Sequence, residues 1–167
     1  LPKLLENKSA VYYPFATYPG LETQVDGWLS KVRARVRFGA LCPETQRDAC
    51  AVLDEMRLFK DASEQATMRH AAQISAAGHI RAMQKSAQML REGKDVREYH
   101  LDAELLHEFR QQGSQYSAYS AIVAAGANAC VLHYRADAAQ VKNGDLVLID
   151  AGCELDGYAS DITRTFP

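Results

Sequence analysis

The chain lacks the features that mark membrane-spanning, secreted and nucleic-acid-binding proteins. No apolar run approaches the roughly 20 residues that a membrane-spanning helix requires, and no signal-peptide pattern opens the sequence. The formal net charge of −2 gives no reason to expect nucleic acid as a partner. The one basic cluster, residues 31–37, follows apolar residues at helical spacing, which is typical of the solvated end of a helix. We therefore expect a chain that binds neither membranes nor nucleic acid.

Cysteine is scarce as well. The chain has four cysteines, Cys42, Cys50, Cys130 and Cys153. Their spacing shows no CxxC pair and no dense cluster, which argues against a disulfide scaffold and against a zinc ribbon. We expect Cys153 to be a small packed residue and not a metal ligand. With an ordinary globular composition of 47% hydrophobic and 24% charged residues, this pattern favours the reducing cytoplasm.

The two ends of the chain predict that it is part of a longer protein. It starts at Leu1 and not at Met, and it stops at Pro167 directly after an expected strand, which would lack neighbours. Residues 1–43 contain short apolar runs and a helix that should end near Arg37. Residues 39–43 are the candidate linker, because glycine and proline punctuate them.

Two helices are expected after the linker. The first should cover residues 66–90, where proline is absent, and begin with a capping box of Asp61 and Glu64. Its predicted buried stripe consists of Met68, Ala71, Ala72, Ala76 and Met83. On this helix His70 and His79 are expected to be surface or satisfied core residues, because no HExxH motif surrounds them.

The second helix should begin with a capping box of Asp95 and Glu98 and end at Gly113. Its apolar stripe is Leu101, Leu105 and Phe109. Beyond Gly113 the apolar period changes from 3.6 to 2, which predicts strands at residues 121–125, 131–134 and 146–150. Two helices followed by an antiparallel run indicate an α+β fold.

Asp150 and Asp161 are the most informative pair of residues. Asp150 follows a continuous apolar run, and a second strand pattern covers residues 158–166. A hairpin folded about Leu155 and Asp156 would place the two carboxylates opposite each other, where their repulsion is destabilising without a partner. A divalent cation would supply that partner. The alternative is a hairpin whose two aspartates simply face solvent.

The run LVLIDAGCELDGYASDITRTFP resembles the metal-binding hairpin of the pita-bread metallopeptidases, and within them the aminopeptidase P (Xaa-Pro aminopeptidase) family. The similarity extends to GDLVLID and to residues 131–134, 116–119 and 54–60, roughly two-thirds of the chain. It implies that residues 44–167 form the first half of a pita-bread catalytic domain, with helices packed on an antiparallel sheet. Residues 1–43 would then be the tail of a smaller N-terminal domain.

The resemblance also implies roles for four residues. Asp150 would bind one of two divalent metal ions, expected to be manganese, and Asp161 would bridge both. Tyr119 would reach the bridging aspartate, although an ordinary interface tyrosine is an alternative of equal weight. His133 would hydrogen-bond the peptide substrate and help proton movement; without the resemblance, a lone histidine beside apolar residues is more often just packed.

The activity implied is removal of the N-terminal residue from proline-containing Xaa-Pro peptides by a homo-oligomeric full-length protein. The family takes its remaining ligands, one His and two Glu, from the second half of the domain, and none of the five histidines here matches the motif. We therefore expect residues 1–167 alone to be inactive. Two alternatives stay open: a prolidase acting on Xaa-Pro dipeptides, and a metal-free relative that serves as a binding or assembly module.

Overall fold

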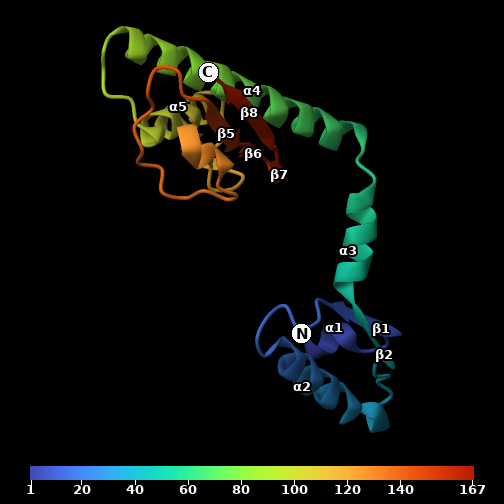
Figure 1. The fold of residues 1–167 in the computed structure, drawn as a ribbon. Helices are drawn as coiled ribbons and strands as arrows, with labels where there is room; N and C mark the ends of the chain where they lie inside the picture. Colours follow the sequence, from blue (N-terminus) through green and yellow to red (C-terminus); the bar gives the residue numbers. More distant parts are fainter. The chain divides into compact units, whose positions relative to one another are not determined.

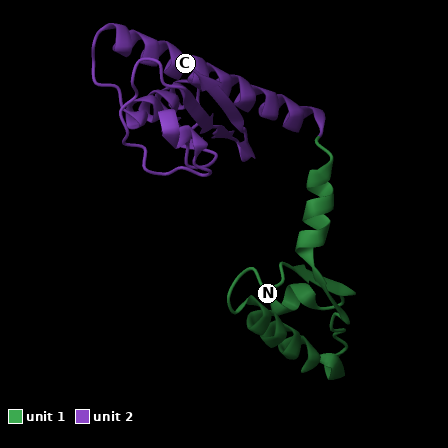
Figure 2. Ribbon diagram, viewed as in Figure 1, with its two compact units in different colours: residues 1–60 green, residues 61–167 purple.

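The computed structural model describes all 167 residues and shows an α+β chain (Figure 1), which confirms the predicted class. The chain forms two compact units, Leu1–Lys60 and Asp61–Pro167 (Figure 2). The sequence places the domain boundary at Pro43 instead. The compact-unit boundary falls later because residues 45–48 pair with residues 10–13 and so belong to the first unit. None of the helices combines the length and the apolar content that a membrane span needs.

The first unit is small and contains one two-stranded parallel sheet. Its elements are α1 (Pro2–Leu5), β1 (Ala10–Tyr13), α2 (Leu21–Arg33), η1 (Val36–Phe38), β2 (Thr45–Asp48) and α3 (Ala49–Leu58). Strands β1 and β2 pair from Ala10 opposite Thr45. Val25, Leu29 and Val32 of α2 are buried. The helix expected near the end of this region therefore forms, although it ends at Arg33.

The second unit places two long helices against antiparallel sheets. Its elements are α4 (Ala62–Arg91), α5 (Glu98–Gln111), β3 (Tyr116–Ser117), β4 (Ile122–Ala125), η2 (Gly126–Cys130), β5 (Val147–Ala151), β6 (Cys153–Leu155), β7 (Tyr158–Ala159) and β8 (Ile162–Phe166). One sheet has the strand order β4-β5-β8 and the other β3-β6-β7. Because β5 runs into β6 and β7 into β8, these four strands form one long ribbon shared by both sheets.

Helix α4 begins with the predicted capping box. The Glu64 backbone N–H donates to the Asp61 carboxylate at 2.8 Å, and the Asp61 N–H donates to Glu64 at 2.6 Å. The buried face is Ala71, Ile74, Ser75, Gly78, His79, Ala82 and Ser86. Of the predicted stripe only Ala71 belongs to it. The prediction was wrong because small and polar residues face the sheet and α5 here, so hydrophobicity selects a different face of the helix.

Helix α5 begins differently from the prediction. Glu98 is its first residue and is fully buried, so it does not cap the helix together with Asp95. Asp95 instead forms an ion pair with Arg97 at 2.8 Å, and the Arg97 N–H donates to His100 Nδ1 at 3.0 Å. The second predicted capping box is therefore wrong, because the Glu98 carboxylate has partners elsewhere in the fold.

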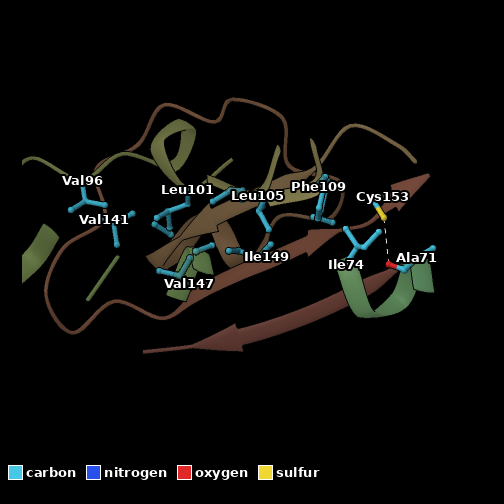
Figure 3. Packing of buried hydrophobic residues seen from close by; sticks show 14 residues of the cluster. Ala71, Ile74, Val96, Leu101, Leu105, Phe109, Val141, Val147, Ile149 and Cys153 are labelled. Atoms are coloured by element: carbon cyan, nitrogen blue, oxygen red, sulfur yellow. Dashed lines mark hydrogen bonds between the residues drawn. The ribbon is translucent and has the colours of Figure 1, made fainter. Parts of the chain in front are cut away.

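The core of the second unit lies between the helices and one face of the β4-β5-β8 sheet. The predicted stripe of Leu101, Leu105 and Phe109 is buried and packs with strand residues such as Val147 and Ile149 (Figure 3). Alternate residues of β5 are buried against this core, as expected of a strand with one face covered. The other face of β5 is the one that bears Asp150.

The register of the long ribbon differs from the prediction by two residues. Leu155 lies opposite Tyr158, and Asp150 lies opposite Thr163 and not opposite Asp161. The two loop residues, Asp156 and Gly157, both have positive φ, 51° and 84°. This is the conformation of a type I′ turn, which Asp-Gly adopts more readily than Leu-Asp does. The turn therefore centres one residue later than the predicted one.

Candidate metal centre

Asp150 and Asp161 lie on the same face of the ribbon despite the changed register. Asp150 is opposite Thr163 in the β5–β8 pairing, and Asp161 precedes Thr163 by two residues, so both side chains leave the sheet on one side. They are diagonal neighbours across the strand pair, a separation that polar side chains can bridge. The core occupies the opposite face of the sheet, so neither carboxylate lies in the core.

Tyr119 joins the two carboxylates. Its hydroxyl lies 2.5 Å from Asp150 Oδ1 and 2.9 Å from Asp161 Oδ1. One hydroxyl proton can be donated to only one of them at a time. Burial, followed by hydrogen bonding to the two aspartates, raises the pKa of Tyr119 well above its usual value, so the phenol stays protonated. Tyr119 is therefore a hydrogen-bond donor shared by both aspartates, and its role in orienting metal ligands stays a prediction.

The chemistry of these donors fits part of a site for a hard divalent cation. The two carboxylates share a single proton donor, so several of their oxygen lone pairs have no partner, and their negative charges repel each other. A bound cation would accept the lone pairs and offset the repulsion. The structure has no group of three or more His, Cys, Asp or Glu side chains arranged to hold a metal ion. Asp150 and Asp161 thus form an incomplete ligand set within this chain.

A close approach of the two strands shapes the ribbon beside the carboxylates. A Cβ atom on Gly152 would lie 1.7 Å from the backbone oxygen of Ser160, so this position accepts only glycine. The Ser160 hydroxyl is 2.7 Å from the hydroxyl of Ser75 on α4, and Ser75 also accepts from the Cys153 N–H at 2.8 Å. These hydrogen bonds hold the ribbon against α4. They involve residues that lie between Asp150 and Asp161 in the sequence.

Cys153 is the packed residue that the sequence predicts. It is fully buried, and its thiol donates to the backbone oxygen of Ala71 on α4 at 3.3 Å (Figure 3). The thiol is thus occupied on the core side of the ribbon. It lies on the opposite side from the candidate ligands.

His79 of α4 supports the same part of the ribbon. It is 2% exposed, and its Nε2 donates to the backbone oxygen of Ala151, the residue after Asp150, at 3.1 Å. Its Nδ1 has no hydrogen-bond partner. Burial lowers the pKa of His79, with the nearby Arg164 also lowering it. His79 is thus a neutral core histidine with one ring nitrogen hydrogen-bonded. It contacts the residue next to the candidate ligand Asp150.

His133 lies near Asp150 but not on a strand. It is exposed and sits in a turn with a φ of 53°. The predicted strand at residues 131–134 is therefore wrong: Val131 and Leu132 are 54% and 85% exposed, so their apolar side chains are not a buried strand. His133 and Asp150 line the same open cavity of about 310 Å³, together with Thr163.

For three residues near the candidate ligands, the sequence indicates the structural role only partly or not at all. Thr163 has no distinguishing pattern, and its place depends on the register of the ribbon. Gly152 follows a strand and precedes another, a position where an isolated glycine signals close backbone approach. His79 could be found only by knowing which face of α4 meets the ribbon.

The buried His79 makes the stability of the fold depend on pH. Since its pKa is lowered in the folded state, the unfolded chain binds more protons below about pH 6.5. Stability is therefore present above that pH and lost as the pH falls toward the folded pKa. His79→Gln, which keeps a donor for Ala151 and does not titrate, should lose less stability than wild type when unfolding is measured from about pH 7.5 down to 5.5.

His70 is the matched control, because it lies on the same helix and is exposed. His70→Gln should follow the wild-type pH curve. Parallel curves for wild type and His79→Gln would contradict the assignment.

Known proteins match both the sequence and the fold of this chain. Residues 66–167 match the family model "Metallopeptidase family M24". Over 167 residues the chain is 44% identical to the Xaa-Pro aminopeptidase of Escherichia coli (strain K12), covering 100% of this chain and 36% of that protein. Over the same length it is 41% identical to the Xaa-Pro aminopeptidase of Haemophilus influenzae, covering 35% of it. The chain thus spans about a third of the length of these curated relatives.

Solved structures of aminopeptidases also match the fold of this chain. The aminopeptidase PepP of Pseudomonas aeruginosa superposes with a TM-score of 0.87 and 47% sequence identity over 99% of this chain and 36% of that chain. Escherichia coli aminopeptidase P in complex with substrate gives a TM-score of 0.86 and 42% identity at the same coverage. These matches confirm the predicted fold, helices on an antiparallel sheet as in part of a pita-bread metallopeptidase. The chain belongs to metallopeptidase family M24 and resembles aminopeptidase P along its whole length.

Proposed function

We propose that this chain supplies half of the metal site of an aminopeptidase that removes the N-terminal residue from Xaa-Pro peptides. We use the term full-length enzyme for a protein that contains this chain and is as long as the Xaa-Pro aminopeptidases that the chain matches. The observation that carries the proposal is the Tyr119 hydroxyl between the Asp150 and Asp161 carboxylates. Two acidic side chains brought together on one sheet face, beside a cavity with a histidine, are suited to metal-assisted hydrolysis.

Each residue has one proposed task. Asp150 would hold one divalent ion and Asp161 would hold both, since a carboxylate has two oxygens to offer. Bound divalent ions would lower the pKa of water to near neutral pH and offset negative charge on the scissile carbonyl oxygen. Tyr119 orients the carboxylates by donating a hydrogen bond to one or the other of them. His133 hydrogen-bonds the peptide in the cavity that it lines together with Asp150.

The chemistry of the donors supports a hard divalent cation, because carboxylate oxygens suit Mg²⁺, Ca²⁺ and Mn²⁺ better than soft metals. Among these we propose manganese. The four free cysteines support a reducing compartment, and we propose the cytoplasm. A homo-oligomeric full-length enzyme stays a prediction.

The substrate class follows from the names of the relatives and from the chemistry of proline. Two relatives are Xaa-Pro aminopeptidases. Proline has no backbone N–H and a fixed φ, so peptides with proline in second place need an enzyme that does not rely on that N–H. A prolidase, acting on dipeptides only, is the second candidate within the same chemistry. A metal-free binding module is the third, and metal analysis separates it from both.

The function is tested by comparing peptide hydrolysis in the full-length enzyme with that of residues 1–167. The full-length enzyme loaded with manganese should release the first residue from a tripeptide with proline in second place, and should leave the matched peptide with alanine in second place uncut. Residues 1–167 alone should be as inactive as a metal-free control, since they hold only two candidate ligands. Cleavage of Xaa-Pro dipeptides but not tripeptides would favour the prolidase.

The bridging role of Asp161 is tested by metal content. Asp161→Asn in the full-length enzyme should lose more metal than Asp150→Asn, because a bridging carboxylate contacts both ions and offsets their mutual repulsion. Elemental analysis of each purified variant measures the ratio of metal to protein. Asp54→Asn, an exposed aspartate on α3, is the control and should keep both metals. If Asp150→Asn loses both ions while Asp161→Asn keeps them, the bridging assignment is reversed.

A further inference from the structure

Glu98 is a buried carboxylate far from the candidate metal ligands in the sequence. It is the first residue of α5 and is fully buried. A buried carboxylate is costly unless hydrogen bonds satisfy it, so its partners identify its task. Helix capping does not account for it, because the side chain accepts no hydrogen bond from the first turn of α5.

Four donors from two separate segments satisfy Glu98. Its Oε1 accepts from the Ala125 N–H at 2.9 Å and from Asn128 Nδ2 at 3.1 Å. Its Oε2 accepts from the Tyr134 hydroxyl at 3.0 Å and from the Ala139 N–H at 2.9 Å. The first pair belongs to the end of β4 and to η2. The second pair belongs to the irregular segment 131–139.

Segment 131–139 has no helix or strand to hold it. Its backbone is fixed where the Val131 N–H donates to the Asn128 oxygen at 2.9 Å, and where Ala139 meets Glu98. Asn128 also donates to the Tyr134 hydroxyl at 3.0 Å. Glu98 therefore contacts the residues that fix both ends of the segment, as well as Tyr134 within it.

His133 is the neighbour of Tyr134 in this segment. Its φ of 53° is left-handed, which is uncommon for a non-glycine residue. Moving Tyr134 would move His133 relative to Asp150 across the cavity that both line. Small displacements of a group that contacts the substrate can lower the catalytic rate strongly.

We propose that Glu98 is a positioning residue, which acts through Tyr134 and Asn128 to place His133 against the peptide substrate. This inference rests on the proposed function. Glu98 has no part in holding metal, since its carboxylate is occupied by these donors. Its loss should therefore change hydrolysis without changing metal content, and only while His133 is present.

The test is a double-mutant cycle in the manganese-loaded full-length enzyme. Tyr134→Phe removes only the hydroxyl that Glu98 accepts from, and should lower kcat/KM about tenfold with the metal-to-protein ratio unchanged. In a His133→Ala background the same substitution should change kcat/KM less than about twofold, because the residue through which it acts is gone. Tyr158→Phe is the matched control: Tyr158 donates to Glu64 at 2.5 Å, another tyrosine–glutamate pair, and should leave kcat/KM unchanged.

Glu98→Gln provides a second variant. The amide NH₂ of the glutamine would face two hydrogen-bond donors, where the carboxylate oxygen accepted from both. We therefore expect kcat/KM to fall further than in Tyr134→Phe, again only with His133 present. Equal effects of Tyr134→Phe with and without His133, or full activity in Tyr134→Phe, would overturn the inference while the proposed function stands. A wild-type enzyme that does not cleave Xaa-Pro peptides would overturn the proposed function, and this inference with it.

Discussion

The candidate site depends on the close contact of two strands at Gly152 and Ser160. The Ser160 oxygen occupies the space that any side chain at residue 152 would fill, and the Ser160 hydroxyl is fastened to Ser75 of α4. This contact lies between the two candidate ligands along the ribbon. Together with the two-residue turn at Asp156 and Gly157, it decides that Asp150 and Asp161 lie on one face as diagonal neighbours.

That arrangement has an electrostatic cost. Two carboxylates near each other repel, and the fold offers them one tyrosine proton to share. A sequence selected for stability alone would place a neutral residue at one of the two positions. The cost is understandable if a cation occupies the site, because the repulsion that destabilises the empty ribbon then becomes attraction to the metal. Local conflict of this kind is expected at functional sites.

Local patterns in the sequence predict part of the local structure. The Asp61–Glu64 capping box and the stripe of Leu101, Leu105 and Phe109 depend on residues three or four apart, and the structure confirms both. The signal for the observed turn is present in the sequence, because Asp156 and Gly157 are a type I′ pair. The predicted hairpin, folded about Leu155 and Asp156, does not use it.

The remaining features depend on partners that are distant in the sequence. The buried face of α4 consists of small and polar residues because it meets the ribbon and α5, which composition does not reveal. The pattern of Asp95 and Glu98 predicts a cap, but the partners of Glu98 lie 27 to 41 residues away and no local pattern indicates them. The apolar residues beside His133 predict a strand, yet Leu132 is exposed. The sequence alone therefore does not show which distant groups hold these side chains in place.

The central claim is that Asp150 and Asp161 together hold divalent metal. Crystals of the full-length enzyme grown with Mn²⁺ and measured at the manganese absorption edge test it most directly. We expect two anomalous peaks beside the ribbon, with Asp161 oxygens within about 2.0–2.6 Å of both and Asp150 oxygens within that distance of one. Peaks that lie elsewhere, or peaks that contact neither aspartate, would contradict it.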